Sequence, residues 1–186
     1  MITADRRGWV EQSIRSYQAQ DFAEKELIVV DDGEDSVQDL VAGENIHYIH
    51  CQPTTLAEKR NIALDAAAGK FIAIWDDDDW WRQNRLSIQV AALQNHPKKN
   101  VCIFKSLLCH DIDIGDTWIY QPPDTSWLDC SAVFKRHSAR MTGAGTGETI
   151  RYLSRYPRWS WEILWGDPYV GIHFRHKRCC SPIFRV

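Results

Sequence analysis

Four consecutive aspartates, Asp76 to Asp79, directly follow the apolar run FIAIW at residues 71–75. Two carboxylates about 4 Å apart repel each other by about 1 kcal/mol in water and by about 4 kcal/mol where the effective dielectric constant is near 20. A positive group is therefore expected beside this aspartate segment (residues 76–79). A divalent cation suits it, because Mg²⁺ typically binds one or two protein carboxylates and leaves its other positions to water and phosphate oxygens. The alternative is a solvated acidic turn.

The elements that must position these carboxylates alternate between helices and strands. Such alternation predicts an α/β fold with a largely parallel sheet, which binds ligands at the carboxyl ends of its strands. The aspartate segment and a second acidic pair, Asp31-Asp32, both fall at such ends, which favours a binding site over a solvated turn. The expected strands are residues 26–30, 46–50, 71–75 and 101–108, and the expected helices are residues 9–20, 56–68 and the segment containing Leu86, Val90 and Leu93.

Composition limits the class of protein. With 186 residues, 44% of them hydrophobic, the chain is expected to form one domain. A net charge of −3 argues against a nucleic-acid-binding protein. No apolar run reaches the ~20 residues that span a bilayer. The first residues lack the apolar segment of a signal peptide, and six irregularly spaced cysteines do not form a disulfide pattern, so we expect a cytoplasmic protein.

Three segments in order, ELIVVDDGEDS, LAEKRNIALDAAAGKFIAIWDDDDWW and RQNRLSIQVAAL, resemble the family 2 glycosyltransferases of the GT-A fold. The resemblance is close over residues 1–110 and looser over residues 111–186. It implies a single GT-A domain, 1–186, with a Rossmann-like, mostly parallel sheet, a nucleotide-sugar-binding half (1–110) and an acceptor-binding half (111–186). It also implies a metal-dependent, inverting transferase that moves a sugar from a nucleoside-diphosphate sugar, UDP being favoured by analogy, to a hydroxyl of a saccharide or lipid-linked saccharide.

The resemblance assigns residues to the donor site. In such enzymes the acid of the VVDDG loop bonds the nucleotide base, so Asp32, with Asp31 beside it, is the candidate here. A Mn²⁺ or Mg²⁺ ion would bind Asp78, with His173 completing its shell, and would neutralise the charge that builds on the leaving diphosphate. The other nucleotide-sugar residues that the resemblance implies are Thr3, Ala4 and Asp5 of the first loop, Arg60 of the K-R-N helix, and Asp76 and Asp77 for the ribose and sugar hydroxyls.

The catalytic base is the least regular part of the match. In the family it is typically an Asp in a short G-E-D segment that opens a helix, and the nearest match is GTGETIRYL at residues 145–153. Glu148 occupies the Glu position, but Thr149 stands where the Asp would be, and a threonine hydroxyl is no general base near neutral pH. Glu148 is therefore the candidate base; a stabilising role in the first helical turn is the alternative. Trp127 is the candidate acceptor-facing residue.

Other features leave alternatives open. Family members begin with a full apolar strand, whereas this chain begins inside it, so a short first strand is expected. The tail at residues 169–182 either closes over the diphosphate, offers a zinc site, or is a solvated basic tail that permits peripheral membrane contact. The alternative functions are a degenerate relative that binds the nucleotide sugar without transfer and a nucleotidyltransferase-like enzyme. The latter is disfavoured because no Gly-rich phosphate loop with a following Lys is present.

Overall fold

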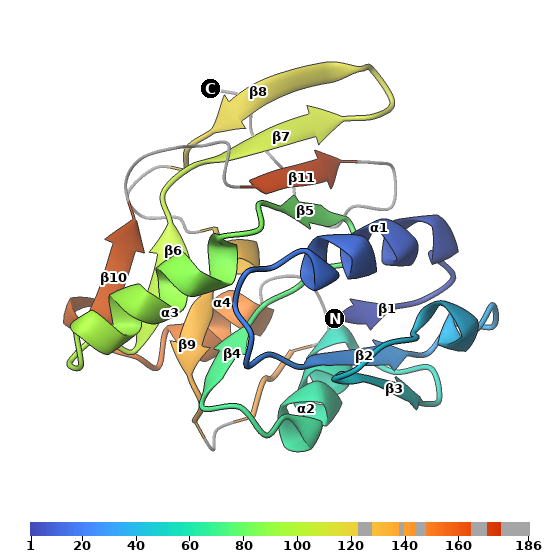
Figure 1. The fold of residues 1–186 in the computed structure, drawn as a ribbon, viewed down its shortest axis with the longest axis horizontal. Coiled ribbons are helices and arrows are strands. Elements are labelled where there is room, and N and C mark those ends of the chain that lie inside the picture. Colours follow the sequence, from blue (N-terminus) through green and yellow to red (C-terminus); the bar gives the residue numbers. More distant parts are fainter. Residues whose placement is uncertain (123–127, 138–139, 144–147, 165–170, 176–186) are drawn as a thin grey trace.

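The computed structural model of the chain describes residues 1–122, 128–137, 140–143, 148–164 and 171–175 (Figure 1). Among these residues, no helix is both long and apolar enough to cross a bilayer.

The described residues form three sheets flanked by helices (Figure 1). The first sheet has the order β1-β2-β3, and both of its strand pairs are parallel. The second has the order β10-β6-β9-β4, with β10 parallel to β6 and the other pairs antiparallel. The third has the order β5-β11-β7-β8, with β11 parallel to β7 and the other pairs antiparallel. The strands are β1 (Ile2–Thr3), β2 (Leu27–Asp31), β3 (Ile46–His50), β4 (Phe71–Ala73), β5 (Asp79–Trp81), β6 (Val101–Phe104), β7 (Leu107–Asp111), β8 (Asp116–Tyr120), β9 (Val133–Lys135), β10 (Trp161–Leu164) and β11 (Gly171–Arg175).

The helices follow the predicted positions closely. The four α-helices of the described residues are α1 (Arg7–Gln18), α2 (Leu56–Ala66), α3 (Arg85–Asn95) and the short α4 (Glu148–Leu153), and the 3₁₀ turns are η1 (Gln38–Leu40), η2 (Asp129–Ser131) and η3 (Arg158–Ser160). Thr55 caps α2, because its side chain accepts a hydrogen bond from the backbone N–H of Glu58. The predicted α/β class is confirmed.

The β2 strand is buried along its whole length because helices cover both faces of its sheet. Leu27 and Val29 belong to the core cluster that includes apolar residues of α1. The alternate residues, Ile28 and Val30, belong to a cluster with the apolar side of α2. An uninterrupted apolar run is the pattern expected of a parallel strand covered on both faces.

The predicted strand at residues 101–108 is in fact two strands in two different sheets. β6 ends at Phe104 and β7 begins at Leu107. Between them, the backbone N–H of Lys105 donates to Leu164 O, and its Nζ donates to Pro122 O at 3.2 Å. The chain therefore changes sheets at a buried polar residue, which an apolar run with one lysine does not reveal.

The first strand is short, as expected, with only Ile2 and Thr3 paired to β2. A cavity of about 730 Å³ lies on the side of β1 and β2 that faces β4. Its wall is mainly apolar and includes Ile28, Ala63 and Ile72.

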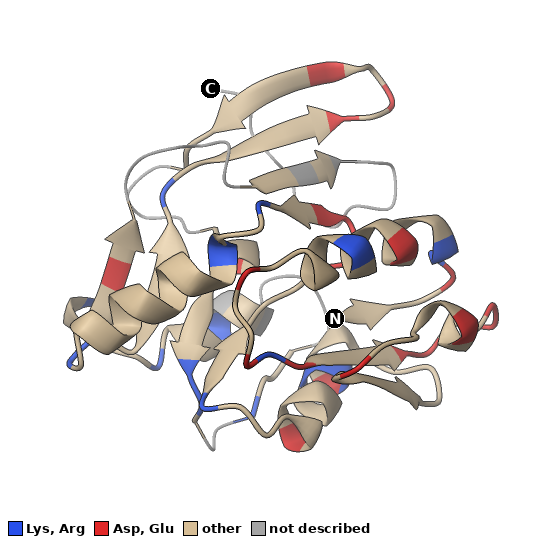
Figure 2. Ribbon diagram, in the orientation of Figure 1, with Lys and Arg blue, Asp and Glu red and all other residues tan. Residues whose placement is uncertain are grey.

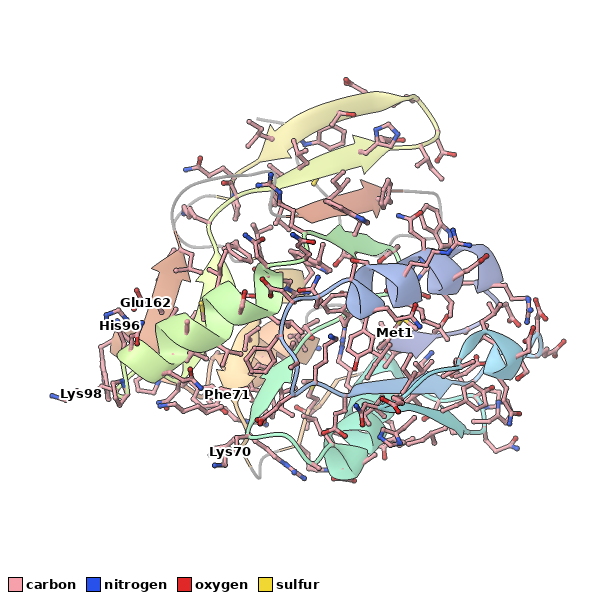
Figure 3. All side chains as sticks on the ribbon, in the orientation of Figure 1. Met1, Lys70, Phe71, His96, Lys98 and Glu162 are labelled. Atoms are coloured by element: carbon pink, nitrogen blue, oxygen red, sulfur yellow. The ribbon has the colours of Figure 1, made fainter. Side chains whose placement is uncertain are left out.

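Basic residues gather at the end of the molecule where β4 begins and β9 ends (Figure 2). The backbone N–H of Arg136 donates to Lys70 O, and Nζ of Lys135 donates to Pro97 O. Near this end, Nδ1 of His96 lies 3.7 Å from the carboxylate of Glu162 (Figure 3). Lys70 and Phe71 mark the start of β4, so the aspartate segment follows the opposite end of that strand (Figure 3).

Candidate functional site

Thr3 joins the two acidic clusters at the end of β1. Its hydroxyl donates to Oδ2 of Asp77 at 2.8 Å, and its carbonyl accepts from Nζ of Lys59 at 3.1 Å. Lys59 in turn donates to Oδ1 of Asp32 at 2.6 Å. The carboxyl ends of β1 and β2, which are parallel strands of one sheet, therefore meet the segment that follows β4 of the second sheet.

Arg6 bridges two members of the aspartate segment. Its Nη1 donates to Oδ1 of Asp77 at 2.7 Å, and its Nη2 donates to Oδ2 of Asp78 at 2.9 Å. Both aspartates are buried, whereas a fifth of the arginine side chain is exposed. The positive group that the sequence demands is thus supplied, in part, by the chain itself.

A second arginine neutralises the start of the same segment. Nη2 of Arg60, on α2, lies 3.0 Å from Oδ1 of Asp76. Arg60 was expected at the nucleotide-sugar site, and its guanidinium lies beside the aspartate segment. Arg6 precedes α1 and Arg60 lies on α2, so the segment is held by two separate parts of the chain.

Arg85 holds the two ends of the aspartate segment together. Its fully buried guanidinium stacks 3.6 Å from the ring centroid of Trp81 and 5.1 Å from that of Trp75, and it donates to Ile74 O at 2.8 Å. Trp81 is buried in this arrangement, whereas Trp80 is exposed. The aspartate segment is therefore anchored at both ends by buried tryptophans.

Burial is the largest influence on Asp77, whose side chain is only 2% exposed. It raises the pKa of Asp77 to about 7, against the lowering effect of Arg6. Neighbouring aspartates raise the pKa further, and the hydrogen bond from Thr3 lowers it. Asp77 therefore changes charge near neutral pH.

The two acids of the DDG loop (residues 31–33) have different surroundings. Asp31 is completely buried and accepts from Gly33 N, Val37 N and the hydroxyl of Tyr48, so its carboxylate is committed to holding the loop. Asp31 was expected to bind the nucleotide together with Asp32. Its buried carboxylate instead accepts hydrogen bonds from within the protein and supports the loop. Burial alone would raise the pKa of Asp32, but its hydrogen bonds outweigh burial and lower the pKa, so the carboxylate stays ionised.

A pocket of about 530 Å³ opens beside Asp32. Its wall also includes Gly33, Ser36, Tyr48 and His50. Gly33 packs closely against the first loop, because a Cβ at this position would lie 2.5 Å from the backbone nitrogen of Asp5. Glycine therefore permits the DDG loop to pack on the first loop. Asp5, at φ 52°, accepts from Asp35 N, which ties the first loop to the DDG loop.

The acceptor side is described only in part. Glu148 is the first residue of α4, but its side chain lies outside the described part of the chain, as does all of Trp127. The next residue, Thr149, is buried, and its hydroxyl has no hydrogen-bond partner among the described residues. The tail from residue 176 onward, with its predicted diphosphate or zinc contacts, also lies outside the described residues.

The side chains of the site can be compared with the ligands that a divalent cation requires. In the described part of the chain, no three His, Cys, Asp or Glu side chains gather around one point. Asp78 nevertheless fits Mg²⁺ or Mn²⁺, because such ions accept one protein carboxylate when phosphate and water oxygens complete the shell. His173 pairs with Asp79 through the backbone of β11, and its side chain is not described.

Two basic residues of the site, Arg6 and Lys59, were not predicted from the sequence. Both contact the acidic residues from positions far away in the chain, as their ion pairs with Asp77 and Asp32 show. A signal existed in each case: Arg6 directly follows the T-A-D loop, and Lys59 directly precedes Arg60. Basic residues beside the predicted loop and helix were therefore the available indication that the chain supplies its own cations.

Carboxylates that gather where the strands of an α/β fold end are typical of a ligand-binding site. Residues 1–107 match the sequence profile of glycosyl transferase family 2, and the chain belongs to that family.

Two curated relatives illustrate the match. TuaG of Bacillus subtilis (strain 168), whose name places it in teichuronic acid biosynthesis, is 28% identical over 134 residues, which are 66% of this chain and 52% of TuaG. WcaA of Escherichia coli (strain K12), whose name places it in colanic acid biosynthesis, is 38% identical over 101 residues, which are 50% of this chain and 36% of WcaA. The chain thus spans about half, or less, of the length of these relatives.

Solved structures share the fold at low identity. Residues 1–349 of TarS from S. aureus, in complex with UDP, match with a TM-score of 0.73 and 17% identity, over 94% of this chain and 59% of that chain. The mannosyltransferase PcManGT from Pyrobaculum calidifontis, in complex with GDP-Man and Mn²⁺, matches with a TM-score of 0.69 and 16% identity, over 96% of this chain and 56% of that chain. These matches confirm the predicted GT-A fold.

Proposed function

We propose that the chain binds a nucleoside-diphosphate sugar and transfers its sugar, with inversion, to a hydroxyl of a saccharide or lipid-linked saccharide. The observation that carries the proposal is the meeting of Asp32 and the aspartate segment around Thr3. The shared family and the nucleotide-bound structures of the same fold support it.

The nucleotide base would enter the pocket beside Asp32. The lowered pKa of Asp32 keeps its carboxylate an acceptor, which suits a base that presents an N–H group. Uracil has such a group, as other bases do, and UDP is favoured here by analogy with the family. Asp5 lies across the DDG loop from this pocket and would line the nucleotide.

The diphosphate and sugar would lie over the aspartate segment. Asp78 would hold Mn²⁺ or Mg²⁺, which neutralises negative charge on a leaving diphosphate. Asp76 and Asp77 would accept hydrogen bonds from ribose and sugar hydroxyls, and Arg60 would face the diphosphate. Arg85 packs against Trp75 and Trp81, which flank the segment, and so helps to hold its backbone in place.

The acceptor would approach from the second half of the chain. Glu148 would take the proton from the attacking hydroxyl, and Trp127 would offer an aromatic face to the acceptor sugar. His173 would complete the metal shell. We also propose that the protein is cytoplasmic with peripheral membrane contact. The proposed donor-binding half is 1–110, and the proposed acceptor-binding half is 111–186.

A second candidate function is donor binding without transfer. The observation that favours it is Thr149, which stands where the family has an acid and whose buried hydroxyl has no partner in the described part of the chain. The two candidates differ only in the base, because both require the same donor site.

The discriminating experiment measures hydrolysis of UDP-sugars and transfer to a saccharide panel by the wild type, Glu148→Gln and Thr149→Val. Transfer predicts turnover by the wild type and a loss of about 100-fold or more in Glu148→Gln, because a positioned general base typically contributes 10²–10⁴-fold. Donor binding measured in parallel should stay unchanged. Donor binding with no turnover in all three proteins, the wild type included, would favour the second candidate.

A further inference from the structure

We propose that Arg6 is an exchangeable internal cation: it holds the carboxylates of Asp77 and Asp78 in the metal-free protein and releases Asp78 when a divalent cation binds. The inference rests on the proposed function, since it takes Asp78 as the metal ligand. It gives Arg6 a positioning role at the donor site.

The contact geometry matches an ion pair that spans two acids. Nη1 and Nη2 of Arg6 lie 2.7 Å and 2.9 Å from one oxygen each of Asp77 and Asp78. A guanidinium presents its donors in a planar fork, so one arginine can hold two carboxylates at a fixed separation. The aspartates are therefore arranged before any ligand arrives.

Competition follows from charge and from the shared oxygen. Oδ2 of Asp78 accepts from Nη2 of Arg6, so a divalent cation that approaches this oxygen meets a positive guanidinium beside it. Two cations beside one buried carboxylate also repel each other. Asp77 accepts from both Nη1 of Arg6 and the hydroxyl of Thr3, so it keeps the hydrogen bond from Thr3 when Arg6 releases Asp78.

The position of Arg6 allows such an exchange. It is the residue that precedes α1, with backbone angles of φ −133° and ψ 39°, and no side-chain cap ties it to the helix. Its side chain is 20% exposed, whereas Asp77 is 2% exposed. Part of the Arg6 side chain therefore faces solvent already, at the edge of the buried aspartates.

The test measures Mn²⁺ affinity without nucleotide, by titration calorimetry or by the electron paramagnetic resonance of free Mn²⁺. The wild type is compared with Arg6→Gln, Arg6→Lys and the matched control Arg7→Gln. Arg7 is the neighbouring residue and pairs with Asp39, outside the aspartate segment. Removing a competing ion pair should tighten Mn²⁺ binding in Arg6→Gln by about tenfold. Arg6→Lys should fall between, because an ammonium cannot present the planar fork. Arg7→Gln should match the wild type.

A second readout separates competition from loss of folding. Without metal, Arg6→Gln should melt at a lower temperature than the wild type, because two buried carboxylates lose their partner. Added Mn²⁺ should raise the melting temperature of Arg6→Gln more than that of the wild type. A residue with a purely structural role would produce the first effect without the second.

Weaker or unchanged Mn²⁺ binding in Arg6→Gln would overturn the inference. UDP binding, measured in parallel, distinguishes this failure from failure of the proposed function. Tighter Mn²⁺ binding in Arg6→Gln with no UDP binding by any variant would uphold the exchange and remove the donor assignment. UDP binding with no Mn²⁺ binding by the wild type or Arg6→Gln would overturn the exchange and leave the donor assignment standing.

Discussion

The hydroxyl of Thr3 donates to Oδ2 of Asp77 at 2.8 Å and so links the loop after β1 to the aspartate segment. Thr3→Val keeps the shape of the side chain but leaves a buried carboxylate oxygen without this donor. We expect the free energy of unfolding to fall by about 2 kcal/mol, as for a lost hydrogen bond to a charged group. Urea unfolding measures it. Thr117→Val removes an exposed hydroxyl and should change stability by about 0.5 kcal/mol at most.

Lys59→Met removes the ammonium that lies 2.6 Å from Asp32. Both side chains are more than nine-tenths buried, so the variant should lose about 3 kcal/mol of stability, because one buried charge is left unpaired. The exposed residue Lys70 offers a control, since Lys70→Met should be close to neutral. Equal effects of the two substitutions would contradict the buried pair.

The same pair predicts a pH dependence. Hydrogen bonds lower the pKa of Asp32 below its ordinary value of 3.8, so the folded state binds this proton more weakly than the unfolded state. The stabilisation is therefore fully present above pH 3.8 and is lost as the pH falls through the lowered pKa. Unfolding free energies measured across this range should show a smaller acid-side loss in Lys59→Met than in the wild type. An equal loss of unfolding free energy at acid pH in both proteins would contradict the role of this ion pair.

Two glycines should respond to alanine in opposite directions. A Cβ at Gly33 would lie 2.5 Å from the backbone nitrogen of Asp5, so Gly33→Ala must push the first loop away and should weaken UDP binding as well as stability. Gly8 lies in α1, and a Cβ there would have no neighbour within 4 Å, so Gly8→Ala should stabilise by about 0.5–1 kcal/mol. Thermal melting and UDP titration check both.

Thr149→Val should stabilise the protein by about 1 kcal/mol. The hydroxyl of Thr149 is buried without a partner among the described residues, so replacing it with a methyl group removes a desolvation cost. Ser13→Ala is the matched control, because its buried hydroxyl donates to Asp76 O and accepts from Trp75 Nε1. Destabilisation in both variants would show that the hydroxyl of Thr149 has a partner.

Periodicity predicted the elements that carry local signals. The β2 run and the α2 helix were found because each is continuous in sequence and ends at a recognisable residue or loop. The break at Lys105 was missed because a change of sheet depends on β10 and β11, which come much later in the chain.

The candidate site divides in the same way. Its acids were visible because they are adjacent in sequence, but the separate burial of Asp31 and Asp32 depends on the fold of the DDG loop. Arg6 was missed because 71 positions separate it from Asp77, and no local pattern reports such a contact. A cluster of acids indicated that a cation was needed without indicating that the chain supplies one.

The central claim, a metal-dependent donor site on the aspartate segment, is tested most directly by melting the protein with UDP and Mn²⁺ and then with UDP and a chelator. At ~100 times its Kd, a bound donor nucleotide should add ~2.7 kcal/mol of stability to the wild type. We expect this gain with Mn²⁺, a much smaller gain with chelator, and little metal dependence in Asp78→Asn. The same gain in Asp78→Asn, or no gain in the wild type with UDP, GDP, dTDP or CDP, would contradict the claim.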